Sequence, residues 1–233
     1  MLNAMLVKAS TACSEYVCVV NVHMTIEAWK DKSFATVVRQ SFMATPDGMP
    51  IALALRRLYS MKQERVAGMD LLPDLIREAE QRHLKMVFYG GSQVVLDAMK
   101  QKNKLLFPAL HALYISPPFG TLSESLQAEL VERVNAFQPN IVCVCLGCPK
   151  QEKWMASMRG KVNGLMIGLG GAFAVYAGAE KRAPLWMQKV SLEWLYRFAQ
   201  DPVRLWKRYV LTNSLFLLLV LKHYLFKRPI PNI

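Results

Sequence analysis

The stretch Ile141-Val-Cys-Val-Cys-Leu-Gly-Cys-Pro-Lys-Gln-Glu-Lys-Trp154 changes from apolar to polar within a few residues. Residues 141–146 form an apolar run of the length and composition of a buried strand. Pro149 then favours the start of a helix, whose first turn carries Lys150 and Gln151. A strand that runs through a short turn into a helix is the repeating unit of a parallel α/β sheet, and ligands bind at such turns.

The same alternation continues along the chain. The expected strands are residues 16–22, 85–89, 113–116, 141–146 and 164–168. The expected helices are residues 25–40, 50–59, 71–83, 93–102, 123–137 and 149–157. This pattern predicts a Rossmann-like α/β fold, with a mainly parallel sheet flanked by helices.

Composition limits the class of protein. The 233 residues are 53% hydrophobic and 20% charged, which excludes a disordered chain and fits one domain of ordinary size. The mean hydropathy of +0.16 is high for a protein that never contacts a membrane. The formal net charge of +12 favours a polyanionic partner, which means nucleic acid, anionic lipid or a phosphorylated substrate.

The positive charge is concentrated towards the C-terminus, where residues 181–228 carry ten lysines and arginines. Residues 209–221 are uncharged, but these 13 residues are fewer than the roughly 20 that cross a bilayer. We therefore expect a core over residues 1–180 and a helical appendage over residues 181–233 that lies on an anionic membrane surface. Whether residues 209–226 cross the membrane or only lie on it stays open, and a buried pair of C-terminal helices is the alternative. The expected basic flanks of the apolar run are Lys207, Arg208, Lys222, Lys227 and Arg228.

Five cysteines lie in apolar runs: Cys13, Cys18, Cys143, Cys145 and Cys148. An odd number in this setting favours reduced thiols over a disulfide framework. Three of them are close together, but no second pair follows at the spacing of zinc ligands, so structural thiols are favoured over a metal site. No signal peptide opens the sequence, and we expect a cytoplasmic protein.

Polar residues and glycines follow several predicted strands, where an open α/β sheet binds ligands. Asp47 lies in a turn before a helix, and is either a general base or an Asx-turn or helix-cap residue. Gly90 and Gly91 allow a phosphate to approach the backbone, although a plain tight turn explains them equally well. Gln151 is a candidate to bind a sugar or uracil. Lys150 is a candidate to face a diphosphate, unless it is a solvated charge at the start of a helix.

A second glycine-rich turn, over residues 168–171, and the later Arg182 are candidate walls of a nucleotide pocket. The arginines suited to balance the charge on a departing diphosphate are Arg65, Arg197, Arg204 and Arg208. The chain has no D-x-D pair of the kind that holds Mg²⁺ or Mn²⁺ on a sugar nucleotide. We therefore expect cationic side chains to replace a metal, and we expect no cofactor.

Taken together, a set of short motifs resembles the WecG/TagA/CpsF glycosyltransferases (family 26) in order and spacing. The motifs are Asn21-Val-His23, Pro46-Asp-Gly-Met-Pro50, Glu64-Arg-Val-Ala-Gly-Met-Asp70, Phe88-Tyr-Gly-Gly91, Ser116-Pro-Pro-Phe-Gly120, Leu146-Gly-Cys-Pro-Lys-Gln-Glu-Lys-Trp154, Gly170-Gly-Ala-Phe173, Ala177-Gly178, Arg182-Ala-Pro184 and Glu193-Trp-Leu-Tyr-Arg197. The resemblance runs from about Val20 to Tyr209. It implies transfer of N-acetylmannosamine, its uronic acid or a related hexose from UDP to an undecaprenyl-diphosphate-linked saccharide, in teichoic acid, common-antigen or exopolysaccharide synthesis.

The resemblance also implies roles for individual residues. Asp47 becomes the catalytic base of a single inverting displacement, in which it takes the proton of the acceptor hydroxyl. Arg65 and Gln151 contact the substrate or the transition state, and Asn21 lies near the reacting sugar. The diphosphate-side contacts from the appendage are Arg197 and Arg204. The other residues expected to bind substrate are Gly90, Gly91, Pro118, Gly147, Lys150, Gly170, Arg182 and Arg208.

Two other classes of protein account for part of the sequence. A non-catalytic basic module that binds anionic lipid or nucleic acid explains the charge alone. Nucleic acid is not expected, because the basic residues neighbour an aliphatic run instead of interleaved aromatics. A nicotinamide-dependent oxidoreductase shares the fold, but the chain lacks the G-x-G-x-x-G motif. We expect an enzyme held peripherally on the inner face of the cell membrane, with self-association possible.

Overall fold

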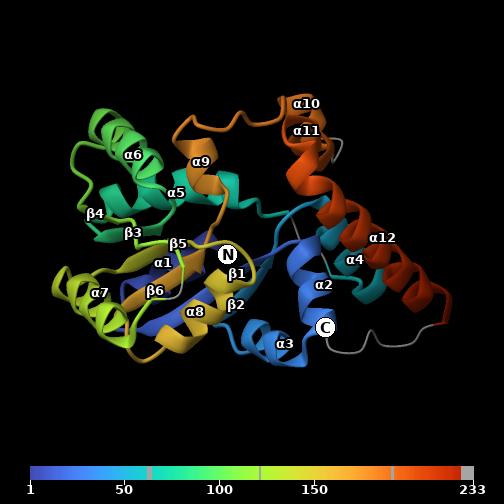
Figure 1. Ribbon diagram of the computed structural model, residues 1–233, viewed down its shortest axis with the longest axis horizontal. Helices are drawn as coiled ribbons and strands as arrows, with labels where there is room; N and C mark the ends of the chain where they lie inside the picture. The colour runs from blue at the N-terminus through green and yellow to red at the C-terminus, as the bar shows by residue number, and fades with distance from the viewer. Residues whose placement is uncertain (62–64, 121, 190–191, 227–233) are drawn as a thin grey trace. The chain divides into compact units, whose positions relative to one another are not determined.

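Helices and strands alternate along the chain in a computed structural model that describes residues 1–61, 65–120, 122–189 and 192–226 (Figure 1). The strands are Ser14–Val20 (β1), Met43–Pro46 (β2), Met86–Gly90 (β3), Ala112–Ile115 (β4), Ile141–Cys145 (β5) and Gly164–Gly168 (β6). The helices are Leu2–Ala9 (α1), Val22–Lys30 (α2), Lys32–Arg39 (α3), Met49–Tyr59 (α4), Gly68–Gln81 (α5), Gln93–Leu106 (α6), Glu124–Ala136 (α7), Lys150–Met158 (α8), Ala172–Tyr176 (α9), Leu185–Lys189 (α10), Glu193–Gln200 (α11) and Pro202–Phe226 (α12).

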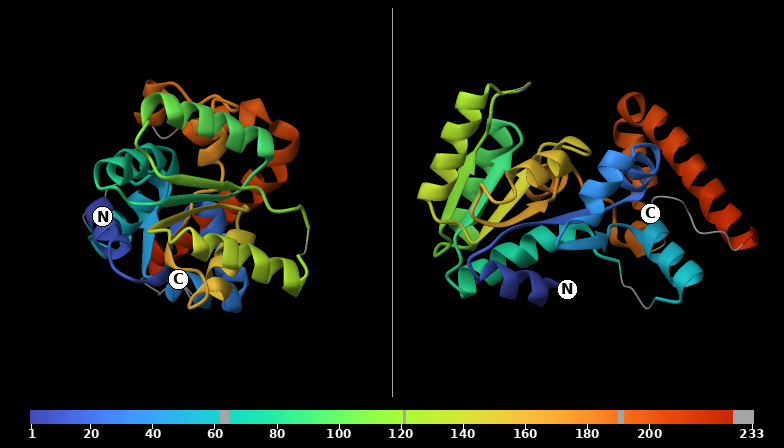
Figure 2. Two further views of the ribbon diagram at one scale, coloured as in Figure 1. Left: turned by 90° about the vertical axis from the view of Figure 1, so that its left-hand side faces the viewer. Right: turned by 90° about the horizontal axis from the view of Figure 1, so that it is seen from below.

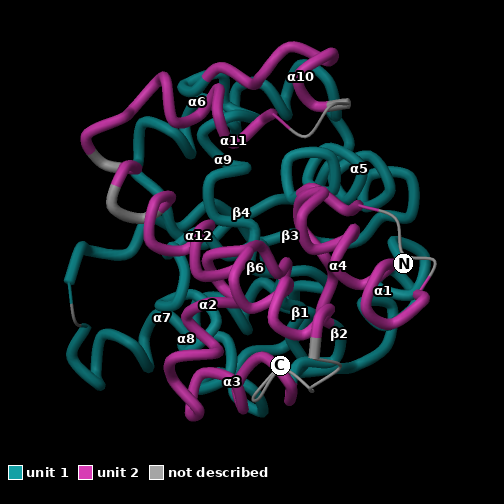
Figure 3. The backbone as a smooth tube through the Cα atoms, turned by 90° about the vertical axis from the view of Figure 1, so that its right-hand side faces the viewer, with its two compact units in different colours: residues 1–18, 41–43, 68–180 teal, residues 19–40, 44–67, 181–233 magenta. Residues whose placement is uncertain are grey.

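The chain divides into two compact units (Figure 3). Unit 1 comprises residues 1–18, 41–43 and 68–180, and unit 2 comprises residues 19–40, 44–67 and 181–233. The C-terminal segment therefore shares its unit with two segments from the first third of the sequence. The functional division into a core over residues 1–180 and an appendage over residues 181–233 stays a prediction.

The strands form one sheet in the order β2-β1-β6-β5-β3-β4. The pairings from β1 across to β4 are all parallel, with Val17 opposite Ile167 and Val87 opposite Val142. β3 and β6 are buried along their whole length, as expected of strands covered on both faces. The predicted Rossmann-like α/β fold, with a parallel sheet flanked by helices, is confirmed.

In unit 1, α5, α6 and α9 cover one face of the sheet, and α7 and α8 cover the other (Figures 1 and 2). Right-handed crossovers require this arrangement. The chain moves outward from β3 to β4 through α6, and then returns to β5 and β6 through α7 and α8. The reversal creates a switch point between β3 and β5, and open α/β sheets bind ligands at the carboxyl ends of strands at such a point.

The prediction of one helix over residues 25–40 is wrong, because Asp31 separates α2 from α3. Its Oδ1 accepts hydrogen bonds from the N–H groups of Ser33 (2.9 Å) and Phe34 (3.2 Å), and so Asp31 caps a new helix. β1 begins two residues before the predicted range of 16–22, since Ser14 already pairs with Gly164 of β6. It also ends two residues early, because Asn21 caps α2. Three short elements, α1, β2 and α9, lie where the sequence predicted none.

In unit 2, α12 runs beside α2 and α4 (Figure 2). Phe216 of α12 is buried against Ile26 of α2 and Ile51 of α4, with further aliphatic side chains around them. The predicted alternative of a buried pair of C-terminal helices thus describes one side of α12, whereas α11 has no buried residue. The exposed apolar face of α12 carries Val203, Trp206, Val210, Leu217, Leu221 and Leu225.

No helix among the described residues combines the length and the hydropathy that a bilayer span requires. Lys222 is exposed on α12, whereas two of the expected basic flanking residues, Lys227 and Arg228, lie outside the described residues. Attachment to a membrane surface through the exposed face of α12 therefore stays a prediction.

Gly90→Ala should destabilise the protein more than Gly160→Ala. Both glycines have positive φ, +100° and +80°, but only at residue 90 would a Cβ overlap with neighbouring backbone, at the Cys145 carbonyl oxygen. Overpacking of this kind costs about 1–3 kcal/mol beyond the shared backbone strain, which corresponds to a Tm lower by about 2–10 °C. Calorimetric melting of the two variants measures the difference, and equal Tm values would show that β3 relaxes away from β5.

Candidate active site

The carboxyl ends of β3 and β5 meet at the switch point of unit 1. The Gly91 N–H donates to the Cys145 carbonyl at 2.9 Å, and the Ser116 hydroxyl, after β4, donates to the Gly91 carbonyl at 2.8 Å. At Gly90 the nearby β5 backbone leaves no room for a Cβ. At Gly147, by contrast, no atom lies within 4 Å of the Cβ position. The two glycines thus serve different purposes: Gly90 permits strand packing, and Gly147 leaves space beside its backbone.

α8 begins directly after this turn. Gln151, in its first turn, is the polar residue of α8 that is best placed to bind a ligand. The Gln151 N–H donates to the Gly147 carbonyl at 2.8 Å, and its side chain is only 4% exposed. Its Nε2 donates to Glu152 Oε1 at 2.6 Å. Its Oε1 lies 3.4 Å from the Cβ position of Gly170, and no hydrogen bond to this atom is found within the described part of the chain. A buried acceptor is costly without a donor, and a ligand N–H or O–H would satisfy it.

Glu152 is fully buried beside Gln151. Burial raises the pKa of this carboxyl group above its usual value, while hydrogen bonds from Gln151, its own backbone and the Cys148 side chain oppose the shift. Three residues after Gln151, Trp154 stacks on Tyr89 of β3 with ring centroids 4.5 Å apart. This stack fixes the start of α8 against the sheet, and with it the orientation of Gln151.

In unit 2, hydrogen bonds with backbone groups fix Asn21 and Asp47 at the ends of their strands. Asn21 directly follows β1, and its Oδ1 accepts from the Met24 N–H at 3.1 Å, which caps α2. Asp47 directly follows β2, and its N–H donates to the Val20 carbonyl at 2.8 Å. Asp47 is half-buried. Because Gly48 is the N-cap of α4, the helix-cap interpretation of Asp47 is wrong.

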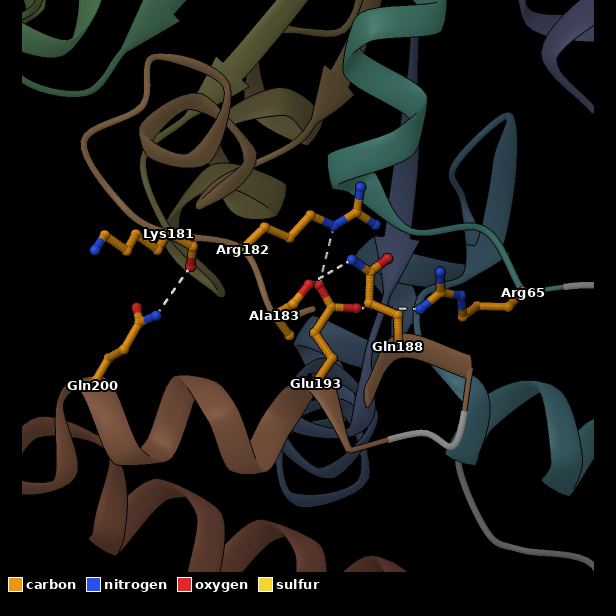
Figure 4. A network of polar contacts seen from close by, with 7 residues as sticks. All are labelled: Arg65, Lys181, Arg182, Ala183, Gln188, Glu193 and Gln200. Carbon is orange, nitrogen blue, oxygen red and sulfur yellow. Dashed lines mark hydrogen bonds and ion pairs between the residues drawn. The ribbon is translucent and has the colours of Figure 1, made fainter. Parts of the chain in front are cut away.

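Arg65 is tied to the same strand end. The N–H of the next residue, Val66, donates to the Pro46 carbonyl at 3.0 Å, directly before Asp47 in the sequence. The Arg65 guanidinium is paired with a carboxylate from α11: its Nη1 lies 3.2 Å from Glu193 Oε2. The second oxygen of this carboxylate, Oε1, lies 3.4 Å from Arg182 Nε (Figure 4). The three side chains are only 18–25% exposed.

The remaining arginines lie on the C-terminal helices. Arg197 is half-buried on α11, one helical turn after Glu193. Arg204 and Arg208 are on α12, but their side chains lie outside the described part of the structure. Their predicted contacts with a diphosphate therefore stay predictions.

The predicted site residues form two groups. Unit 1 contains Gly90, Gly91, Pro118, Gly147, Lys150, Gln151 and Gly170. Unit 2 contains Asn21, Asp47, Arg65, Arg182, Arg197, Arg204 and Arg208. Within unit 1 the structure brings the β3, β5 and β6 turns together, while Pro118 and Lys150 are exposed. Within unit 2 it brings Asp47 and Arg65 to one strand end.

Sequence reasoning missed two residues, Glu152 and Glu193. From the sequence, Glu152 was assigned no role, yet buried Met155 and Met158 mark the inner face of α8, and Glu152 lies three residues before Met155. Helical spacing would have placed it on that face. For Glu193 no such signal exists, because its partners are Arg65 and Arg182, and pairing over these separations cannot be deduced from local spacing.

Among the residues that the structure describes, no group of three or more His, Cys, Asp or Glu side chains is placed to hold a metal ion. The five cysteines are free thiols. Burial raises the pKa of Cys18 to about 12 and that of Cys145 to about 11. These thiols are therefore protonated at neutral pH, which agrees with a structural role.

The Glycosyl transferase WecG/TagA/CpsF family model matches residues 1–229. The chain belongs to this glycosyltransferase family. The match extends at both ends beyond the motifs between about Val20 and Tyr209. Membership decides between the classes of protein that the sequence left open: the chain is a glycosyltransferase, and the non-catalytic and oxidoreductase interpretations are wrong.

Curated relatives in three bacteria are all called N-acetylglucosaminyldiphosphoundecaprenol N-acetyl-beta-D-mannosaminyltransferase. The Bacillus subtilis (strain 168) protein is 33% identical over 204 residues, which cover 87% of this chain and 77% of the relative. The Bacillus spizizenii protein is 30% identical, with 89% and 79% covered. The Staphylococcus aureus (strain MW2) protein is 28% identical, with 83% and 73% covered.

Glu152→Gln should remove a pH-dependent cost of burying a carboxylate. Because burial in the folded chain raises the pKa of Glu152 above its value in the unfolded chain, the folded state binds more protons than the unfolded state at pH values around and between these two pKa values. The free energy of unfolding contributed by Glu152 therefore falls as pH rises through this window. Urea unfolding from pH 4.5 to about pH 8 should show wild type losing stability relative to the variant. Parallel profiles would show that the shift is absent, and Glu129→Gln, at an exposed glutamate, is the control.

Proposed function

We propose that the chain transfers N-acetylmannosamine, its uronic acid or a related hexose from a UDP-sugar to an undecaprenyl-diphosphate-linked saccharide, with inversion and without a metal ion. The names of the relatives support the acceptor class, because each includes N-acetylglucosaminyldiphosphoundecaprenol. They also support a hexosamine donor and a β-linked product. The observation that carries the mechanism is the position of Asp47 and Arg65 at one strand end of unit 2.

Asp47 is the base of the proposed reaction. Its carboxylate takes the proton of the acceptor hydroxyl as that oxygen attacks the anomeric carbon. The bond between the anomeric carbon and the diphosphate oxygen breaks in the same step, and its electron pair leaves with UDP. A single displacement of this kind inverts the anomeric centre. Asn21 lies beside the reacting sugar, at the end of the neighbouring strand.

Arginines stabilise the leaving group in this mechanism. Negative charge grows on the diphosphate as the bond breaks, and a guanidinium remains charged at any physiological pH and binds phosphate through two parallel hydrogen bonds. Arg65 and Arg182 supply this charge, and Arg197, Arg204 and Arg208 add to it from the C-terminal helices. Cationic side chains thereby perform the work that a divalent metal performs in other sugar transferases.

The turns of unit 1 bind the donor nucleotide. Gly91 and Gly147 lie where a diphosphate or ribose can approach the backbone, with Gly90 and Gly170 in the adjoining turns. The buried Gln151 oxygen accepts a hydrogen bond from an N–H or O–H group of the donor. Lys150 and Pro118 are the exposed residues of the proposed nucleotide site.

The membrane association of the proposed enzyme rests on α12. Its exposed apolar face inserts at the level of the headgroups, and neighbouring basic residues attract anionic lipid. Peripheral attachment to the inner face of the cell membrane places the enzyme beside a lipid-linked acceptor. Self-association of the chain stays a prediction.

Asp47→Asn should abolish most of the transferase activity while leaving the fold intact. Loss of the general base lowers kcat by about 100- to 10,000-fold. The measurement is UDP release from a panel of UDP-sugars with a synthetic polyprenyl-diphosphate-sugar acceptor, in the presence of EDTA.

Asp97→Asn, at an exposed aspartate of α6, is the matched control and should retain the wild-type rate. Turnover that needs the acceptor and survives EDTA identifies the donor and supports a metal-independent reaction. A full rate in Asp47→Asn would rule out this residue as the base, and a rate that EDTA abolishes would rule out metal independence.

The double substitution Leu217→Gln and Leu221→Gln should weaken membrane binding by about tenfold, because two exposed leucines of α12 no longer enter the lipid. Flotation with vesicles that contain anionic phospholipid measures this. The matched control is Leu105→Gln with Leu106→Gln, on the exposed end of α6. Equal flotation of both double variants would show that α12 is not the membrane contact.

A further inference from the structure

Glu193 joins three segments that are far apart in the sequence (Figure 4). Its Oε2 pairs with Arg65, in the segment between α4 and α5, at 3.2 Å. Its Oε1 pairs with Arg182, in the segment before α10, at 3.4 Å. Glu193 itself is the first residue of α11. One carboxylate thus holds two guanidinium groups, each through a different oxygen.

Two guanidinium groups that pair with the same carboxylate would repel each other without that anion between them. The repulsion is screened only weakly here, because the three side chains are no more than 25% exposed. Glu193 supplies the anion, and the pairings leave a net positive charge on the group of three. The carboxylate therefore fixes a cationic pair of the kind that binds phosphate groups.

Both arginines are also tied through their backbone. The Val66 N–H bond to the Pro46 carbonyl holds Arg65 beside the strand end that carries Asp47. On the other side, Gln188 of α10 donates to the Ala183 carbonyl at 2.7 Å. Gln200 of α11 donates to the Lys181 carbonyl at 3.1 Å (Figure 4). The residues on either side of Arg182 are therefore held by α10 and by α11, the helix that begins at Glu193.

We propose that Glu193 is a positioning residue that holds Arg65 and Arg182 as a preformed clamp for a diphosphate. It acts through the two arginines and does not touch the substrate. The proposal rests on the proposed function in taking the donor diphosphate as the ligand of the clamp. Because the glutamate sets the angle between the guanidinium groups, its loss leaves the positive charge in place but removes the geometry that a diphosphate needs.

Binding of inorganic pyrophosphate, measured by calorimetry, tests the clamp without any sugar transfer. Glu193→Gln should weaken pyrophosphate binding by about tenfold, although the substitution makes the protein more positive. Glu129→Gln makes the same change in net charge at an exposed position of α7 and should leave the affinity unchanged. Glu193→Asp keeps the carboxylate on a shorter side chain, and its affinity for pyrophosphate should fall between those of wild type and Glu193→Gln. If melting shows that Glu193→Gln does not fold, Glu193→Asp replaces it in the test.

A double-mutant cycle tests whether Glu193 acts through Arg182. Glu193→Gln should weaken pyrophosphate binding much less in an Arg182→Ala background than in wild type. Equal effects in the two backgrounds would overturn the proposal, since a residue with a general structural role has the same effect in both. Tighter binding to Glu193→Gln would overturn it as well, because Glu193 would then compete with phosphate for the arginines. No measurable binding to wild type would show that the clamp does not exist.

Transferase kinetics separate this proposal from the proposed function. If wild type releases UDP, Glu193→Gln should lower kcat by about 100-fold through misplacement of the arginines, with a partial recovery in Glu193→Asp. An unchanged kcat would overturn the positioning role. If wild type turns over no donor while the pyrophosphate results hold, the clamp stands and the proposed reaction is wrong.

Discussion

In unit 1, the backbone of β5 lies so close to β3 that residue 90 has no room for a side chain. This contact follows from the topology, because β3 leads outward to β4 and the chain then returns on the other side of β3 to form β5. The carboxyl ends of the two strands are thereby held together by the hydrogen bond between Gly91 and Cys145. The turn that starts α8, the buried amide of Gln151 and the stack of Trp154 on Tyr89 all depend on this arrangement.

In unit 2, charged side chains from separate segments of the chain are held close together. Asp47 and Arg65 reach one strand end through backbone hydrogen bonds, whose geometry does not depend on their side chains. The side chains of Asp47 and Arg65 can therefore be substituted without loss of the backbone hydrogen bonds that form this strand end. The second arginine, Arg182, comes from the C-terminal part of the chain and is held by a carboxylate. A single carboxylate between two guanidinium groups thus links segments that the backbone bonds of the strand ends do not connect.

The sequence was sufficient to predict five of the six described strands, because buried parallel strands are continuous apolar runs: residues 164–168 were predicted with their observed bounds. The short strand β2 was not predicted, because only two of its four residues are buried. The position of Gln151 in the first turn of a helix was also predictable, since the residue follows a predicted strand and a proline. Residues 25–40 were predicted wrongly, because helical periodicity does not register a cap such as Asp31 in the middle of the pattern. The roles of Glu152 and Glu193 depend on burial and on partners distant in the sequence. Short patterns do not contain this information.

The central claim is that one displacement, with Asp47 as base, moves the sugar from UDP to the acceptor. The configuration of the anomeric centre in the product tests this most directly, because a single displacement must invert it, whereas a double displacement through a covalent enzyme intermediate retains it. The measurement is the one-bond carbon–hydrogen coupling at the anomeric position, by NMR of the product made from an α-linked UDP-sugar. A β-linked product is the predicted result. An α-linked product would contradict the mechanism and would require a nucleophile in the place of the base.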